Sequence, residues 1–468
     1  MMNFKNSLTA FAVAAALGLS SSVMAADTGG LKIKVTDQNG NPIAGATVLV
    51  KAPDSLVSKN AVSDAEGFVS LRGLDASSQY TVSINGNQIQ AFEANNVRVI
   101  TGKSLNLSYV VSNASSNMET IVVSGRAVSA IDTTSATTGM DITLGMTESL
   151  PTGRSYQSYL QLTPGVKPSS SGNPSSKSGV NYSDAGGAVG TSSDNVYYID
   201  GVNVTDNVDG TFGGNINSEI IQEQQVITGA IPAKYAGGSG LVSRVVTKSG
   251  SNEFHGSINY YFQNDSLVAD SKAEGQRESG FSDFDTAVTL GGPIIQDELW
   301  FFASYQIKSE DTDVTDSETG DLKRVVNKET KLGFGKLTWQ ATDSDRLSVT
   351  FFNDPSVQDG STNSDTPQNR DVATDGGGNN YKIDYSHSWD DLVLNAGYMS
   401  HESEFSSVAF DKSTRNDVAL SANASTAKIA DLSKGGLGAD TLRDRNKSSY
   451  YINGEYYLDT NDFGYHTI

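Results

Sequence analysis

Cysteine is absent from this chain of 468 residues. Disulfides, thiolate metal sites, cysteine nucleophiles and lipid anchors on cysteine are therefore excluded. Basic residues are also few, because 33 lysines and arginines stand against 54 acidic residues and give a formal net charge of -21. This balance argues against nucleic acid or an anionic lipid surface as the main partner. Proline is scarce, with 10 residues, and glycine is frequent, with 46, which suits a β-rich chain with many turns.

Residues that carry catalysis or bind metals are scarce as well. The four histidines are His255, His387, His401 and His466, and none has the spacing of a metal-binding motif. Gly102-Lys103-Ser104 ends like a phosphate-binding loop, but Val97 stands where its first glycine belongs. The acidic run over residues 310–321 has its glycine at the wrong position for an EF-hand, so we interpret it as a solvated loop. The sequence therefore predicts no metal site, no cofactor and no enzymatic activity.

No stretch of the chain reaches the roughly twenty apolar residues that a membrane helix needs. The N-terminal apolar run, residues 8–19, is shorter, follows the positive charge of Lys5 and precedes the small-residue cleavage site Val23-Met24-Ala25. Residues 1–25 are therefore predicted to be a secretory signal, with an internal helix as the alternative. An exported chain without a membrane helix crosses a membrane only as a closed β-barrel.

Residues 26–112 alternate short apolar strands with turns. Strands are expected at residues 31–35, 47–51, 68–71, 80–84 and 105–109, with Asn85-Gly86 as a tight hairpin. Such regular spacing predicts a β-sandwich. Residues 35–48 followed by residues 63–68 resemble the carboxypeptidase regulatory-like domain, an immunoglobulin-like or transthyretin-like module. This resemblance implies a spacer or interaction module, and the absence of histidine here speaks against enzymatic activity.

The segment 118–125 separates this unit from the rest of the chain. It is β-branched at Thr120, Ile121, Val122 and Val123, which favours an extended backbone. Polar, flexible sequence flanks it on both sides. An extended segment of this kind can add itself as a strand to another protein's sheet edge. The alternative is an ordinary strand that closes the preceding domain.

Residues 127–250 predict a smaller unit with both helix and strand. A turn and a short helix are expected over residues 149–160, ended by Pro164-Gly165, and a loop rich in serine, glycine and asparagine over residues 167–195. An apolar strand is expected at residues 196–199, and a second strand or a helix-to-strand passage at residues 220–227.

Five motifs in this order resemble the TonB box, the plug and the plug-to-barrel junction of TonB-dependent outer-membrane receptors, and more narrowly the Oar-like group. They cover residues 119–123, 150–155, 164–166, 198–202 and 247–256. The resemblance implies that Glu119, Thr120, Ile121, Val122, Val123 and Ser124 pair with the periplasmic protein TonB, which draws energy from the inner-membrane proton gradient. It also implies a substrate-facing plug loop with Asn181, Tyr182 and Asp184. Arg154 and Arg244 are candidates for an anionic ligand, although salt bridges to carboxylates of the barrel wall are the simpler interpretation.

Residues 251–468 show period-two alternation of apolar and polar side chains. Strands are expected at residues 254–263, 299–307, 347–351, 381–389, 392–398 and 450–458, with a short turn at residues 343–346 and a long loop at residues 353–380. Segments of about ten residues with this alternation are typical of a transmembrane barrel. A soluble sandwich shows the same alternation. Roughly eight to ten such strands enclose too little space for a plug, so we expect a longer protein with a 22-stranded barrel, as the resemblance implies.

The predicted fold is mainly β. It comprises the signal (1–25), an immunoglobulin-like or transthyretin-like sandwich (26–112), a linker with the TonB box (113–126), an α+β plug (127–250) and the first part of a transmembrane barrel (251–468). The predicted function is TonB-driven uptake of a large or scarce extracellular substrate across the outer membrane of a Gram-negative bacterium. The N-terminal domain would lie in the periplasm. The expected partners are TonB, the proton-driven complex, and outer-membrane lipid with lipopolysaccharide. The alternative is an exported, non-transporting adhesin or binding module.

Overall fold

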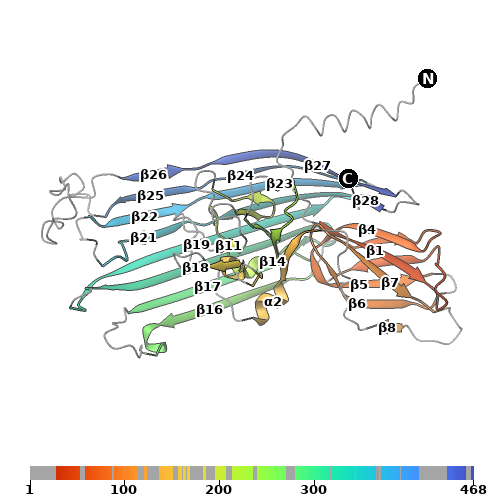
Figure 1. The fold of residues 1–468 in the computed structure, drawn as a ribbon, viewed down its shortest axis with the longest axis horizontal. Coiled ribbons are helices and arrows are strands. Elements are labelled where there is room, and N and C mark those ends of the chain that lie inside the picture. The colour runs from red at the N-terminus through yellow and green to blue at the C-terminus, as the bar shows by residue number, and fades with distance from the viewer. Residues whose placement is uncertain are drawn as a thin grey trace, which may run out of the picture.

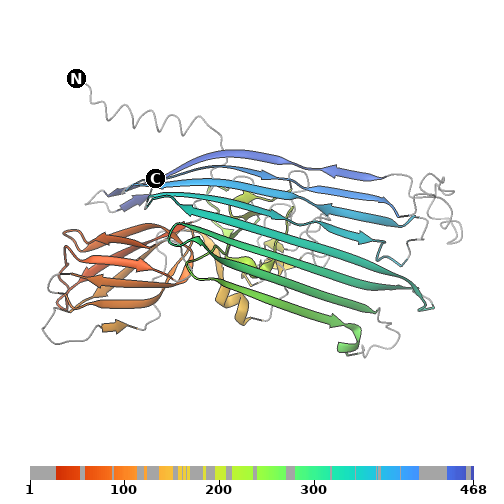
Figure 2. The same cartoon turned by 180° about the vertical axis from the view of Figure 1, so that it is seen from behind.

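The structure is a computed structural model. It describes residues 28–52, 58–86, 89–112, 121–123, 136–150, 156–160, 162–164, 166–168, 183–185, 195–206, 213–235, 240–269, 280–316, 319–342, 344–364, 366, 370–389, 392–410, 440–459 and 465–467. The expected signal at residues 1–25 lies outside these ranges. Figure 1 shows three parts: an N-terminal sandwich, a small middle sheet, and a large curved sheet. The middle sheet lies on one face of the large sheet in both views (Figures 1 and 2).

The N-terminal sandwich pairs a sheet of order β4-β1-β7 with a sheet of order β3-β2-β5-β6-β8. Its strands are β1 (Thr28–Thr36), β2 (Thr47–Lys51), β3 (Lys59–Val62), β4 (Phe68–Asp75), β5 (Ser77–Asn85), β6 (Phe92–Val99) and β7 (Ser104–Val110). Alternate side chains point into a shared core; Ile33, Val48 and Tyr80 are completely buried. The five expected strands are confirmed, whereas β3 and β6 were missed.

The hairpin expected at Asn85-Gly86 is confirmed, although it is not a tight one. β5 and β6 do pair antiparallel, but the register joins Ile84 to Phe92, so the connection is longer than two residues. The connection extends beyond Asn85-Gly86 because Phe92 supplies the next core position of the sandwich. Phe92 is buried there against Tyr109, with ring centroids 5.1 Å apart. Burial of a large aromatic outweighs local turn preference.

The middle sheet has the order β13-β12-β15-β14-β9. Its strands are β9 (Thr138–Thr143), β12 (Val196–Ile199), β13 (Val202–Asn203), β14 (Ile221–Gly229) and β15 (Val242–Thr247). The helices α2 (Leu144–Ser149), α3 (Tyr156–Leu160) and η2 (Ser218–Ile220) accompany it. All four residues of β12 are buried, as the apolar run predicted. The expected short helix is present as α3, and the strand expected at residues 220–227 is β14.

The large sheet contains 13 antiparallel strands. They are β16 (His255–Asn264), β17 (Phe281–Ile295), β18 (Leu299–Thr315), β19 (Leu322–Gln340), β20 (Asp345–Asn353), β21 (Ser356–Asp359), β22 (Val372–Gly377), β23 (Asn379–Ser388), β24 (Leu392–His401), β25 (Glu404–Ala409), β26 (Thr441–Asp444), β27 (Lys447–Asp459) and β28 (Tyr465–Thr467). The six strands expected from alternation are all present, as β16, β18, β20, β23, β24 and β27. The other seven were missed: β17, β19, β21, β22, β25, β26 and β28.

Two segments expected to be loops are strands instead. The acidic run continues β18 as far as Thr315, which pairs with Leu322 of β19. Within residues 353–380, β21 pairs with β19 and β22, so the expected long loop forms part of the sheet. Long neighbouring strands satisfy the backbone of these polar segments, which local sequence alone does not indicate.

The two faces of the large sheet are inverted relative to a soluble protein. Ile258 and Tyr450 on the outer face are 78% and 79% exposed, whereas Gln306 and Asn380 on the inner face are 1% and 0% exposed. A large apolar outer surface together with a polar interior is the pattern of a lipid-facing barrel wall, so the soluble-sandwich interpretation is not favoured. Among the residues that the structure describes, no helix has the length and apolar character of a membrane span.

The inner face is not uniformly polar. Trp300 and Phe302, which interrupt the predicted alternation, are each 1% exposed and point inward. Phe302 contacts Phe334 with centroids 6.2 Å apart, and His255 stacks against it at 6.0 Å. Phe302, Phe334 and Phe352 belong to the same apolar cluster as the middle sheet. The seam between the sheets thus combines an apolar patch with polar contacts.

Ser63 offers a direct test of the sandwich. Its buried hydroxyl donates to the Ile43 carbonyl at 2.7 Å and accepts the Ala46 N–H at 2.9 Å. Ser63→Ala should lower the free energy of unfolding of the sandwich by about 1–2 kcal/mol, because two buried groups lose their partner. Amide hydrogen exchange over residues 28–110 measures this change. Ser70→Ala, on an exposed face of β4, is the control; equal losses in both variants would contradict the role of Ser63.

Candidate functional site

The segment expected to bind TonB lies only partly within the described residues. Ile121, Val122 and Val123 form β8 (Ile121–Val123), which pairs in parallel with β6 through Phe92, Glu93 and Ala94. The extended conformation is therefore present. The strand adds to an edge of the sandwich, which is the arrangement that the alternative interpretation expected. Glu119, Thr120 and Ser124 lie outside the described residues, and the interaction with TonB stays a prediction.

Asp200 lies at the tight turn between β12 and β13. Asp200 and Gly201 have φ values of 44° and 78°, as a two-residue hairpin turn of the I′ type requires. Asp200 is 3% exposed, and its carboxylate accepts the backbone N–H of Thr247 at 2.8 Å and the Thr247 hydroxyl at 2.5 Å. Two motifs that sequence reasoning identified separately therefore hold each other in place.

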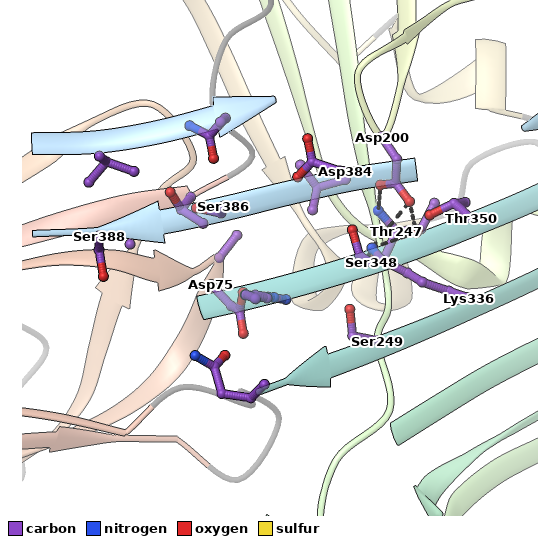
Figure 3. A pocket seen from close by; sticks show the side chains of 18 of the residues that line it. Asp75, Asp200, Thr247, Ser249, Lys336, Ser348, Thr350, Asp384, Ser386 and Ser388 are labelled. Atoms are coloured by element: carbon purple, nitrogen blue, oxygen red, sulfur yellow. Dashed lines mark hydrogen bonds and ion pairs between the residues drawn. The ribbon is translucent and has the colours of Figure 1, made fainter. Parts of the chain in front are cut away.

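Lys336 of β19 adds the third partner of this carboxylate. Its ammonium lies 3.2 Å from Asp200 Oδ2 and 3.3 Å from the Thr247 hydroxyl. The side chains of Lys336 and Asp200 are 11% and 4% exposed, so the ion pair is largely shielded from water. Figure 3 shows the three side chains converging from the middle sheet and the large sheet. A buried ion pair thus joins the middle sheet to the wall.

Further polar contacts fasten the middle sheet along the same inner face. Arg445, between β26 and β27, forms an ion pair with Asp206, which is 9% exposed. Lys447 donates to the Thr205 carbonyl at 2.6 Å. At the other side of the large sheet, Asn217 donates to the Ser304 hydroxyl at 3.0 Å. These contacts are polar or ionic, and they span the width of the sheet.

A second seam joins the middle sheet to the sandwich. Lys103 forms a salt bridge of 2.8 Å with Asp141 of β9, and Gln225 of β14 donates to the same carboxylate at 3.1 Å. Glu223 of β14 is 3% exposed, and its Oε1 has no hydrogen-bond partner among the described residues. Burial, followed by the nearby Asp141 charge, raises the pKa of Glu223 to about 7, against the opposing effects of Arg98 and Arg244.

A cleft lined mostly by polar and charged residues lies where the three parts meet. The sandwich contributes Asp75, which forms a salt bridge of 2.5 Å with Arg346 of β20. Lys336, Lys382 and Asp384 line the cleft from the large sheet. Figure 3 shows Asp75 on one side of this cleft and Asp200 on the other. The sandwich is therefore attached directly to the wall as well as to the middle sheet.

Of the three residues predicted to face the substrate, the structure describes Asp184. It lies in β11 (Ser183–Ala185), where its backbone pairs with Lys167 of β10 (Val166–Pro168). Asn181, Tyr182 and Arg154 lie outside the described residues. Arg244 is buried, donates to Gln225 at 3.0 Å and lies over the Tyr235 ring at 5.8 Å, so these contacts are within the middle sheet. Its predicted salt bridge to a carboxylate of the wall stays a prediction. No group of three or more His, Cys, Asp or Glu side chains in the described ranges is arranged to hold a metal ion.

Sequence reasoning missed the residues that join the three parts: Asp75, Lys103, Asp141, Asp206, Glu223, Lys336, Arg346 and Arg445. They have no shared motif, and their partners lie far away along the chain. The sequence carried only a weak signal for these residues. Lysines such as Lys336 and Lys382 stand at inward-facing strand positions, where they can pair with carboxylates of another part of the chain.

Two family profiles match parts of the chain. The profile described as "Carboxypeptidase regulatory-like domain" matches residues 30–112, and "Outer membrane beta barrel domain" matches residues 246–320. Among curated proteins, the "TonB-dependent transporter Oar" of Myxococcus xanthus is 26% identical over 313 residues, which is 64% of this chain and 28% of that protein. The chain belongs to the TonB-dependent outer-membrane transporters. Within this family it is Oar-like, with the regulatory-like domain at its N-terminus.

Two further proteins are similar to parts of the chain. The "Probable TonB-dependent siderophore receptor PirA" of Acinetobacter baumannii is 31% identical over 135 residues, covering 27% of this chain and 16% of that protein. The crystal structure of the Escherichia coli outer-membrane transporter YddB aligns with a TM-score of 0.54 at 15% identity, covering 68% of this chain and 46% of YddB. The chain thus spans less than half the length of these relatives. The family resides in the outer membrane and is not enzymatic. The sandwich and the large sheet are called the regulatory-like domain and the barrel wall below, after the profiles that match them. The middle sheet is called the plug, the name that the resemblance gives it, and its role as a plug stays a prediction.

The ion pair between plug and wall predicts a specific loss of stability. Lys336→Met leaves the buried Asp200 carboxylate without its cation and should lower the opening free energy of β12 and β15 by about 3 kcal/mol. Lys331→Met removes a cation from the same strand, where Lys331 and Glu329 are 44% and 43% exposed, and should cost less than about 1 kcal/mol. Hydrogen exchange of the plug amides measures both. Equal effects would contradict the proposed importance of the Asp200–Lys336 pair.

The buried Glu223 predicts a pH dependence. Its pKa is raised in the folded protein, so the folded state favours the protonated form and is most stable below pH 4.5. Stability is then lost as the pH rises through about 7, by about 3 kcal/mol in all. Glu223→Gln should remove most of this dependence in the exchange of β14 amides measured from pH 4 to 8. Glu253→Gln, at an exposed position, should keep the wild-type profile. A Glu223→Gln profile that follows the wild type would refute the assignment.

Proposed function

We propose that this protein takes up a large or scarce extracellular substrate across the outer membrane, and that TonB drives the uptake by moving the plug. The observation that carries this proposal is the seating of the plug on the polar inner face of the wall. Its fastenings are ionic and hydrogen-bonded contacts, including Asp200–Lys336 and Asp206–Arg445. Water can replace such contacts when the plug moves, whereas an apolar seal would lose about 25 cal/mol for each Å² exposed.

The connection of the plug to the TonB-binding segment supports the same mechanism. The chain leaves β8 at Val123 and enters the plug at β9, which starts at Thr138. β9 is an edge strand of the plug sheet and pairs only with β14 among the described strands. Tension on the segment therefore reaches an edge strand first, where backbone hydrogen bonds can break one after another. Peeling an edge strand costs less at each step than extracting the whole sheet at once.

The partner in this proposal is the periplasmic TonB domain, which pairs with Glu119, Thr120, Ile121, Val122, Val123 and Ser124. Backbone hydrogen bonds supply most of the affinity in strand addition. Energy comes from the inner-membrane proton gradient through TonB. On the opposite side, the substrate contacts extracellular loops and the plug loop that includes Asn181, Tyr182 and Asp184.

A proline in the TonB-binding segment separates coupling from substrate binding. Val122→Pro removes a backbone N–H that strand addition uses, so it should abolish binding of the purified TonB domain and uptake, and leave binding of the substrate to cells intact. Val128→Pro makes the same exchange outside the segment and should retain TonB binding. Measurements are TonB affinity by titration and uptake by whole cells. Retained TonB binding in Val122→Pro would overturn the assignment of the segment.

A further inference from the structure

The regulatory-like domain offers an open sheet edge at β6, and the segment that occupies it is β8. β6 pairs with β5 on one side and with β8 on the other, so β8 is the last strand of the five-stranded sheet. The register is parallel and joins Phe92 to Ile121, Glu93 to Val122 and Ala94 to Val123. These three residues of β8 lie at the centre of the proposed TonB-binding segment.

The edge that receives β8 is rigid. Phe92 and Ala94 are 6% and 4% exposed and point into the core of the domain, where Phe92 contacts Tyr109. Their backbone is therefore held in an extended conformation before any strand is added. A pre-formed edge lowers the entropic cost of pairing, because only the added segment must be ordered.

The pairing itself is short and tethered. It covers three residues, and the chain connects β8 to the plug through residues 124–137. Fourteen residues of extended chain reach about 50 Å at most. A segment tethered in this way is present at the edge at an effective concentration on the order of millimolar, so a short pairing forms without high intrinsic affinity. The same short pairing is easy for a competing strand to displace.

The domain that holds β8 is itself fastened at two places. Asp75 forms its salt bridge with Arg346 of the wall, and Lys103 forms its salt bridge with Asp141 of the plug. A pull on β8 while it is paired with β6 therefore loads the domain and its two salt bridges, one to the wall and one to the plug. Tension passes along residues 124–137 to the plug only after β8 has left β6.

We propose that the β6 edge of the regulatory-like domain is a docking edge for the TonB-binding segment, and that TonB takes the segment from this edge before it moves the plug. The proposal rests on the function proposed above, because it assumes that TonB binds this segment. It assigns the regulatory-like domain a role in coupling: the domain keeps the segment extended and off the plug until TonB captures it.

Introduced cysteines test the docking directly, because the chain contains no native cysteine. Glu93→Cys with Val122→Cys places two thiols at paired positions, and Glu93→Cys with Ser124→Cys places them two residues out of register. The intact protein in outer-membrane vesicles is treated with a mild oxidant, and disulfide formation is followed by mass spectrometry. The paired variant should cross-link at least tenfold faster than the out-of-register variant. Equal rates would overturn docking on β6.

Addition of the purified periplasmic TonB domain tests the release. At saturation it should slow cross-linking of the Glu93→Cys, Val122→Cys variant at least fivefold, and the oxidised variant should bind TonB only after reduction. A cross-linking rate that TonB leaves unchanged, although TonB is bound, would mean that TonB adds to the outer side of β8, and would overturn the release. Failure of TonB to bind the wild-type protein would refute the proposed function instead, and cross-linking without TonB still reports docking by itself.

Discussion

The carboxylate of Asp200 is the contact on which the arrangement of plug and wall depends. Three donors converge on it: the backbone N–H and the hydroxyl of Thr247, and the ammonium of Lys336. A buried carboxylate is costly unless its oxygens are satisfied. The turn after β12, the end of β15 and the middle of β19 therefore support one another. Displacing any of them removes at least one partner of a buried charge, which links the local geometry of a hairpin to the seating of the whole plug.

The inverted faces of the large sheet explain why this seating is polar. The wall presents apolar side chains outward and polar side chains inward, so the plug meets a surface that water can also cover. The patch around Phe302 and Phe352 adds stability without sealing the seam. This combination holds the plug on the wall through paired charges, and under the proposed function it would let the plug move under force, because the exposed groups are then hydrated.

Glu223 is a buried carboxylate with fewer partners than Asp200. It lies between the regulatory-like domain and the plug sheet, with one oxygen unpaired, and burial raises the pKa of Glu223 to about 7. Asp200 is surrounded by donors at the wall, whereas Glu223 has the Asp141 charge nearby. The seam on the wall is therefore held by full charges, and the seam on the domain side contains a group that is neutral in mildly acidic conditions. The two seams respond differently to their surroundings, although both involve the same sheet.

The sequence by itself determined the β-rich character, the strands with clean alternation and the order of the motifs, because these depend on neighbouring residues and on the period of a strand. It identified the motifs that contain Asp200 and Thr247, yet not that these two residues bond to each other. The strands that were missed are β3, β6, β17, β19, β21, β22, β25, β26 and β28, whose pairing is supplied by neighbouring strands. Only the tertiary structure decided that Asp75 meets Arg346, that Asp200 meets Lys336, and that β8 pairs with β6. Such contacts join positions far apart in the chain. Local sequence preferences do not specify which distant residue pairs with a buried charge, or which strand pairs with an open sheet edge.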